Sequence, residues 1–289
     1  MNSNRKIDAL IFGGEFLIDL DFGIRSLLKY AHDLSLVESG VSIKDLGYKS
    51  DPQSAISVID QNGKVQYGTK GEIQQGSIAK IPVSGVMQMD GGMCSSGIKD
   101  LADFIQQLDA NPNIAGFLFD VNTGGGESTA GIHLYNTVKD LTKPSVAQFH
   151  TMASAGYMAM LPTKEKIALS PMSRVGSIGA LISIDKQFLD WYKNNIQDIY
   201  STKSPDKNSE FNALLNGDHS KLVNSLDKMV SDFHDMVLAH RSLNPQMQDS
   251  TLKGGTFTAK DGKHRGLIDS IGSEAYAKKR LNFYIKNSK

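Results

Sequence analysis

Two short segments of this 289-residue chain place residue types suited to chemistry directly after apolar runs. Glycines 124–126 follow the apolar run 115–121, and Ser154 follows the run 145–149. Each segment precedes apolar residues at helical spacing, so both are expected where a strand gives way to a helix. Glycines there could direct backbone N–H groups at an anion, and a serine there would lie beside the positive end of a helix dipole.

The glycine run has three possible uses. It could cradle a phosphate, but it lacks both the Walker lysine and the G-x-G-x-x-G pattern, so nucleotide binding has no second feature to support it. It could supply the N–H donors of an oxyanion hole. It could also be a tight turn that binds nothing, and the run alone does not decide between the last two.

Ser154 taken alone is better explained as a helix cap than as a nucleophile. Two strand ends from successive βαβ units would lie side by side, however, so that one could offer the hydroxyl and the other the N–H groups. A serine nucleophile also needs a base. No histidine lies between His150 and His219. His150 could touch the site or be an ordinary loop histidine, while Lys203 and Lys207 could serve as the base only if they are buried.

The elements that would position these residues begin near residue 77. Strand-like and helix-like patterns alternate there, at 78–83, 98–108, 115–121, 128–141 and 145–149. Repeated βαβ units predict an α/β fold with a parallel or mixed sheet and sites at the carboxyl ends of its strands. We expect residues 1–76 to form an N-terminal extension with a helical pattern near 20–38, and residues 77–289 to form the main domain.

Composition excludes several classes of protein. Lys+Arg and Asp+Glu number 31 each, so no net charge favours nucleic acid as a partner. The single cysteine, Cys94, cannot form an internal disulfide and is expected to be a small buried side chain, which favours a reducing, cytoplasmic location. No stretch of about 18 apolar residues occurs, so no integral membrane segment is expected.

Four separated motifs together resemble the signal peptide peptidase A family of serine peptidases, family S49. They are Gly125-Gly126, ASAGY at 153–157, GSIG at 176–179 and TFTAKDGKHRGLID at 256–269, and the resemblance covers about residues 78–272. It implies a ClpP/crotonase-like fold with repeated ββα units and a mixed or parallel sheet. It also implies hydrolysis of polypeptides, a ring-like homo-oligomer, and no cofactor or metal ion.

The resemblance also implies catalytic roles. Ser154 would be the nucleophile of a Ser-Lys dyad. The general base would be a lysine some fifty residues later, which fits Lys207 slightly better than its rival Lys203. Ser177, in the GSIG motif, would orient the lysine amine.

The oxyanion hole implied by the resemblance combines Gly125 or Gly126 with the N–H of Ala155. Thr123-Gly124 stands where the family has Ser-Pro, which leaves the register of the glycines open. Ala155 stands where the family usually has glycine. Neither departure removes a reacting group.

Three alternatives and two substrate classes remain at this stage. A ClpP-type Ser-His-Asp peptidase is disfavoured by the missing histidine, and a crotonase-type acyl-CoA enzyme would require neither Ser154 nor a downstream lysine. A non-catalytic capsid or scaffold component would keep the fold without the chemistry. Membrane-attached relatives cleave residual signal peptides, whereas anchorless relatives include phage head-maturation proteases acting on scaffold and capsid proteins, and the lack of an apolar span favours the second group.

Overall fold

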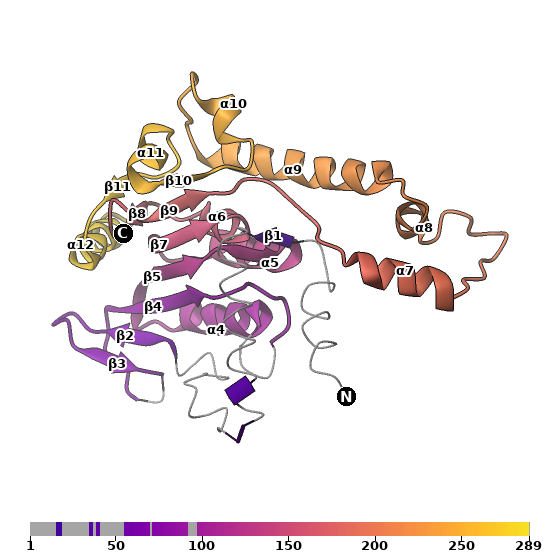
Figure 1. The fold of residues 1–289 in the computed structure, drawn as a ribbon. Coiled ribbons are helices and arrows are strands. Elements are labelled where there is room, and N and C mark those ends of the chain that lie inside the picture. The colour runs from indigo at the N-terminus through magenta and orange to yellow at the C-terminus, as the bar shows by residue number, and fades with distance from the viewer. Residues whose placement is uncertain are drawn as a thin grey trace.

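The computed structural model describes residues 16–18, 35–36, 39–40, 55–69, 71–91 and 97–288. Cys94 and most of the helical pattern at 20–38 lie outside these residues. The described chain confirms the expected α/β fold with a mixed sheet, whose strands follow the order β10-β9-β7-β5-β4-β2-β3 (Figure 1).

The strands include a parallel central group, β4, β5, β7 and β9, with β8 also parallel to β7 and with antiparallel strands at both edges. Their bounds are β1 Phe16–Ile18, β2 Ser57–Ile59, β3 Val65–Tyr67, β4 Ser77–Ser84, β5 Ile114–Thr123, β6 Gly125–Glu127, β7 Ser145–Ala153, β8 Lys166–Ala168, β9 Arg174–Gly176, β10 Thr256–Thr258 and β11 Ser270–Ile271.

The helices connect these strands or extend beyond them. Their bounds are α4 Ile98–Ala110, α5 Ser128–Lys139, α6 Ala155–Met160, α7 Lys186–Asn195, α8 Ser209–Leu215, α9 Ser220–His240, α10 Gln248–Thr251, α11 Ala259–His264 and α12 Glu274–Asn287.

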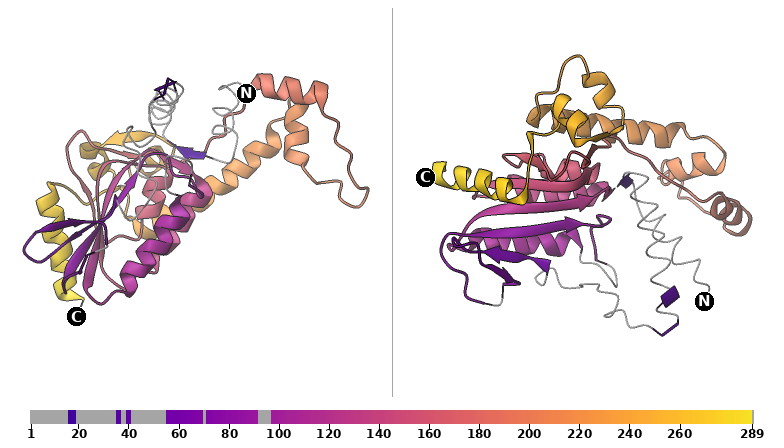
Figure 2. Two further views of the ribbon diagram at one scale, coloured as in Figure 1. Left: turned by 90° about the horizontal axis from the view of Figure 1, so that it is seen from below. Right: turned by 60° about the vertical axis from the view of Figure 1, so that its left-hand side comes forward.

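Both faces of the central sheet are buried, because the runs that form it are apolar throughout. Phe117 and Phe119 of β5 belong to the main core, together with residues of α4, α5 and α6. Leu118, which points to the opposite face, packs with Ala277 and Leu281 of α12. Figure 2 shows the yellow C-terminal helix on one side of the sheet and the magenta helices on the other.

The N-terminal limit of the sheet differs from the boundary expected at residue 77. Strands β2 and β3 precede that boundary, and β2 pairs with β4 through Ser57 and Lys80. The main fold therefore begins before residue 77, because short strands from the expected extension complete one edge of the sheet.

Helices α7, α8 and α9 form an arm that projects from the sheet (Figure 1). No residue of α7 is buried, whereas α9 buries Phe233 and Val237 where it returns to the core. The sheet fixes one end of the arm, and the other end carries exposed apolar side chains.

Candidate active site

The motif segments meet at the carboxyl ends of three neighbouring parallel strands. Thr123 at the end of β5 lies opposite Met152 of β7, and Ala153 at the end of β7 lies opposite Gly176 of β9. The backbone N–H of Ser154 donates to the carbonyl of Gly176 at 2.8 Å. Ser154 is thus held between the glycine segment and the GSIG motif. The pattern of strands and helices predicts its position beside the glycine segment.

Ser154 has a strained backbone and a buried hydroxyl. Its φ of 54° and ψ of −123° put a non-glycine residue in a sparsely populated region, which costs about 1–3 kcal/mol. The side chain is fully buried, and Oγ has no hydrogen-bond partner among the residues that the structure describes. A sharp turn from strand to helix is how several hydrolases present a nucleophilic serine.

Small residues let helix α6 approach the end of β5. A Cβ added to Gly156 would lie 2.4 Å from Cγ2 of Thr123, and one added to Gly131 of α5 would lie 3.0 Å from Cβ of Ala155. A methyl group at Gly156 would force its surroundings to shift, and one at Gly131 would require Ala155 to move by a few tenths of an ångström. The N-terminus of α6 is therefore packed directly against the glycine segment.

The two glycines proposed for the oxyanion hole differ in their backbone contacts. The N–H of Gly125 donates to Oγ1 of Thr123 at 3.0 Å, and that hydroxyl donates to the carbonyl of Gly85 at 2.6 Å. The Gly125 carbonyl accepts from the N–H of Met87 at 2.9 Å, and the N–H of Glu127 donates to the Met87 carbonyl at 2.8 Å. Because backbone groups alternate sides along a strand, the N–H of Gly126 faces away from Met87.

The backbone of Met87 leaves no space for a side chain at Gly126. The φ of Gly126 is 158°, and an added Cβ would lie 2.0 Å from the Met87 carbonyl oxygen. The sequence leaves open whether Gly125 or Gly126 could donate its N–H to an oxyanion. The N–H of Gly125 is already bonded to Thr123, whereas the N–H of Gly126 points to the side of β6 opposite Met87.

Ser177 joins the site through the same set of strand ends. It directly follows β9, has a φ of 54°, and donates its N–H to the Gly255 carbonyl at 2.7 Å. Gly255 immediately precedes β10, which pairs with β9. The TFTAKDG segment therefore supports the strand end that carries Ser177.

The two candidate lysines are not brought to Ser154. Lys203 and Lys207 are exposed in the segment between α7 and α8, on the projecting arm. Lys207 donates its backbone N–H to Ser204, and Lys203 donates its own to Oγ of Ser201. His150 is exposed at an irregularity in the pairing of β7 with β5.

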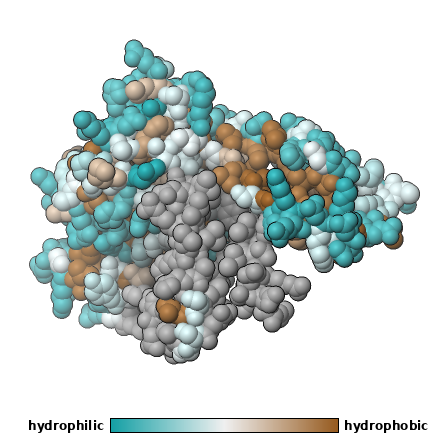
Figure 3. All heavy atoms as spheres, in the orientation of Figure 1, coloured by the Kyte–Doolittle hydropathy of each residue, from teal (hydrophilic) through white to brown (hydrophobic). Residues whose placement is uncertain are grey.

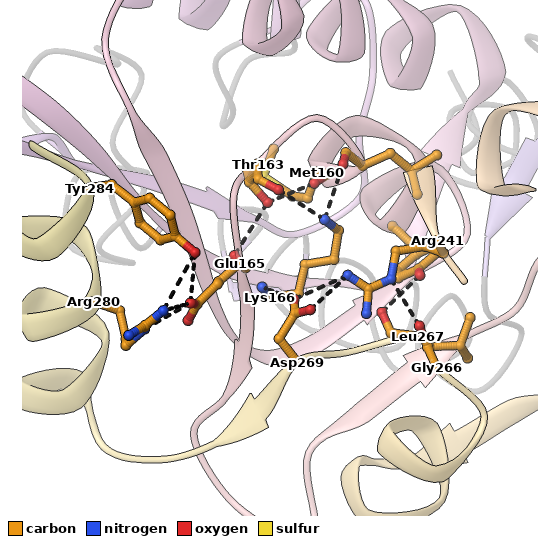
Figure 4. A network of polar contacts seen from close by, with 12 residues as sticks. Met160, Thr163, Glu165, Lys166, Arg241, Gly266, Leu267, Asp269, Arg280 and Tyr284 are labelled. Carbon is orange, nitrogen blue, oxygen red and sulfur yellow. Dashed lines mark hydrogen bonds and ion pairs between the residues drawn. The ribbon is translucent and has the colours of Figure 1, made fainter. Parts of the chain in front are cut away.

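A polar network that the sequence did not reveal surrounds Lys166, just beyond the C-terminus of α6, and is drawn in Figure 4. Nζ of Lys166 donates to the carbonyls of Leu161 and Thr163, at 3.0 and 3.2 Å, just beyond the C-terminus of α6. The pKa of Lys166 is lowered to about 7, mainly by burial and also by the Arg241 charge, with Asp269 opposing the shift. The signal in the sequence is a lysine that begins the apolar run 166–169.

Asp269 and Tyr157 connect this network to the C-terminal motif. Asp269 accepts the backbone N–H of Lys166 at 2.7 Å and pairs with Arg241 at 3.0 Å. The Tyr157 hydroxyl donates to the Leu267 carbonyl at 2.8 Å, and burial raises the pKa of this tyrosine. Helix α6 is thus anchored to the core through Tyr157 and through the residues just beyond its C-terminus.

Within the part of the chain that the structure describes, no group of three or more His, Cys, Asp or Glu side chains could hold a metal ion. None of the helices described is both long and apolar enough to cross a membrane.

Curated relatives of the chain are named as proteases. It is 28% identical over 184 residues to "Putative protease MJ0651" of Methanocaldococcus jannaschii, covering 62% of this chain and 59% of the relative. It is 26% identical over 290 residues to "Protease 4" of Salmonella typhi, covering 94% of this chain and 46% of the relative. The chain therefore spans about half the length of the curated relatives it matches.

Solved structures with a similar chain path have low sequence identity. A ClpP1 mutant from Listeria monocytogenes gives a TM-score of 0.46 at 11% identity, covering 68% of this chain and 93% of that one. An enoyl-CoA hydratase/isomerase family member gives 0.43 at 15% identity, covering 75% of this chain and 74% of that one.

The family assignment rests on a match to a family model. The model described as "Peptidase family S49" matches residues 137–286, more than half of the chain, and this range includes Ser154, Ser177 and the TFTAKDG segment. The chain belongs to peptidase family S49.

Proposed function

We propose that this chain is a serine endopeptidase with Ser154 as its nucleophile. The observation that carries the proposal is the buried Oγ of Ser154, held on a strained turn and without a partner among the described residues. Leaving a buried hydroxyl unpaired costs about 1–3 kcal/mol, which a catalytic role would explain. Membership of family S49 and the protease names of the relatives support the same reading.

In the proposed reaction, Oγ of Ser154 attacks the scissile carbonyl and an oxyanion forms. Ala155 is the first residue of α6, so no carbonyl of its own helix accepts its N–H. We assign that N–H and the N–H of Gly126 as the oxyanion donors, because the N–H of Gly125 is already bonded to Thr123.

The base in this mechanism is Lys207, with Lys203 as its rival and Ser177 as the residue that orients the amine. A lysine accepts a proton only in its neutral form, which requires removal from water. Since both lysines are exposed on the arm and are not brought to Ser154, the dyad forms only when an arm is both placed beside Ser154 and covered. We propose that assembly into a homo-oligomeric ring covers it.

The two groups of the dyad, Ser154 and Lys207, account for every proton transfer and bond change in the proposed reaction. Neutral Lys207 takes the proton of Ser154 as the Oγ–carbon bond forms, and returns it to the leaving amine as the peptide C–N bond breaks. Water, deprotonated by the same lysine, hydrolyses the acyl-enzyme and restores both groups. The substrate is a polypeptide.

The test is labelling by a fluorophosphonate probe together with peptide hydrolysis. Wild-type protein and Ser220→Ala, a control at the first residue of α9, should be labelled and active, whereas Ser154→Ala should be neither. Lys207→Ala should lose hydrolysis almost as completely, because the two groups act as a unit, while Lys203→Ala keeps most of it.

Each alternative predicts a different pattern of results. The reverse result for the two lysine variants would move the base to Lys203. Loss of hydrolysis on His150→Ala, with both lysine variants active, would indicate a histidine base. Absence of both labelling and hydrolysis in the wild type would favour a non-catalytic protein, and turnover of an acyl-CoA substrate by Ser154→Ala would favour a crotonase-type enzyme.

A further inference from the structure

A short strand from the N-terminal part of the chain lies against the glycine segment of the site. Strand β1 pairs antiparallel with β6, so that Leu17 lies opposite Gly126 and Ile18 lies opposite Gly125. These two strands form a sheet of their own, separate from the nine-stranded sheet. Strand β1 therefore pairs with no strand of the nine-stranded sheet, and its position depends on the pairing with β6.

Strand β6 has only one edge left for such a partner. Its other edge is bonded to Met87, through the Gly125 carbonyl and the Glu127 N–H. Alternation along the strand directs the N–H of Gly126 to the edge where β1 lies. That N–H is the donor that we assign to the oxyanion hole, so β1 borders the place where a scissile carbonyl would be held.

We propose that residues 16–18 occupy the position on β6 that an extended peptide substrate takes, so that the N-terminal segment inhibits the site in cis. The proposal rests on the proposed peptidase function. A strand edge pairs with one chain at a time, and strand addition binds a peptide mainly through its backbone. A substrate must therefore displace β1 before it can pair with β6.

The inhibition expected from this contact is competitive and incomplete. Only three residue pairs hold β1 on β6, and an isolated two-stranded pair is marginally stable in water. The site is then open for a fraction of the time, and the apparent dissociation constant of a peptide rises by the inverse of that fraction. Weakening the β1 pairing should lower the dissociation constant without changing the chemistry.

Peptide binding tests this without relying on activity. In a Ser154→Ala background, a fluorescent peptide with the sequence of residues 13–21, GGEFLIDLD, is titrated against full-length protein by anisotropy. Adding Leu17→Pro removes a backbone donor opposite Gly126 and should tighten binding by about threefold or more. Asn4→Pro is the matched control, an equal substitution outside β1. Equal affinity for the three proteins, or no binding to the Leu17→Pro protein, would overturn the proposal.

Hydrogen exchange reports directly on the strand edge. The amide of Gly126 should exchange faster in Leu17→Pro than in wild type or Asn4→Pro, because β1 no longer pairs with it. The amides of Gly125 and Glu127, which donate to Thr123 and Met87, should keep their protection. Unchanged exchange in Leu17→Pro would show that β1 does not pair with β6 in solution.

Kinetics separate this inference from the proposed function. For a fluorogenic peptide, Leu17→Pro should lower KM by about threefold or more and leave kcat unchanged. A wild-type protein that hydrolyses the peptide, with the same KM in Leu17→Pro, would contradict the inference alone. Tighter binding in Leu17→Pro without fluorophosphonate labelling or hydrolysis in the wild type would contradict the peptidase function and leave the strand site standing.

Discussion

Backbone strain marks individual residues of the proposed site. The non-glycine residues with positive φ in the described part of the chain are Ser154, Ser177 and Asn208. Two of them end neighbouring strands at the site, and the third follows Lys207. Strain of this kind persists only where surrounding structure enforces it, and it clusters at functional sites. The proposed nucleophile Ser154 and the proposed positioning residue Ser177 both lie at such positions, whereas Asn208 is in the left-handed region that asparagine readily adopts.

Lys166 makes stability depend on pH in a predictable direction. Burial lowers its pKa to about 7 from an unfolded value of 10.5. Between these values the unfolded chain binds more protons, so this residue should make stability rise with pH. Below about pH 7 both states are protonated, and the folded state bears the full cost of a buried ammonium. Urea unfolding at about pH 6 and about pH 9 measures the difference.

The variant Lys166→Met should abolish that rise, since it removes the titrating amine while keeping a side chain of similar length. Lys193→Met, on the exposed arm helix α7, is the matched control and should keep the wild-type dependence. A wild-type protein whose stability does not change between the two pH values, or an unchanged slope in Lys166→Met, would show that the amine stays protonated throughout this range.

At the scale of elements, one close contact sets where helix α6 sits. Gly156→Ala would place Cβ 2.4 Å from Cγ2 of Thr123, which should cost about 1–3 kcal/mol of stability and displace Ser154 from the glycine segment. Thr123→Ser removes that methyl group and keeps the hydroxyl bonded to Gly85 and Gly125. The double variant should therefore recover most of the stability and labelling lost in Gly156→Ala.

Thermal unfolding and fluorophosphonate labelling of both single variants and the double variant form a mutant cycle. Independent effects of the two substitutions would contradict the proposed steric contact.

The sequence predicts the central elements well because their signals are local. The apolar runs 78–83, 115–121 and 145–149 fall within β4, β5 and β7, and the glycine and Ser154 segments lie at the ends of β5 and β7 as expected. A buried parallel strand is apolar on both faces, so a single run identifies it. Parallel strands also end at one edge of the sheet, which explains why the site segments could be grouped.

Pairings over long distances in sequence could not be predicted in the same way. Strand β3 alternates between exposed and half-buried residues over only three positions, and β1 pairs with a strand more than a hundred residues later. Neither has a local pattern that distinguishes it from a loop. The placement of Lys203 and Lys207 depends on the path of the arm, which a spacing of about fifty residues does not determine.

At the scale of the whole molecule, the arm formed by α7, α8 and α9 carries several exposed large apolar side chains. Its exposed large apolar side chains, among the described residues, are Phe188, Trp191, Ile196, Ile199, Val223 and Leu238. Figure 3 shows apolar surface gathered on this side of the molecule. Contiguous apolar surface of this kind is typical of protein–protein contacts, and the proposed ring would cover it.

The single tryptophan reports on this assembly. Trp191 is 53% exposed in one chain, so burial of the arm should shift its emission to shorter wavelength. Light scattering at micromolar concentration should give a mass well above 31.5 kDa.

The variant Ile199→Asp puts a charge on the most exposed apolar side chain of the arm, which is 90% exposed. Because burying a charge in an interface is costly, this variant should be monomeric, with unshifted tryptophan emission and without fluorophosphonate labelling. Met172→Asp, at a 79% exposed position outside the arm, should behave as wild type. A wild-type monomer that labels as fast as any assembled form would refute the ring and would mean that the arm closes the dyad within one chain.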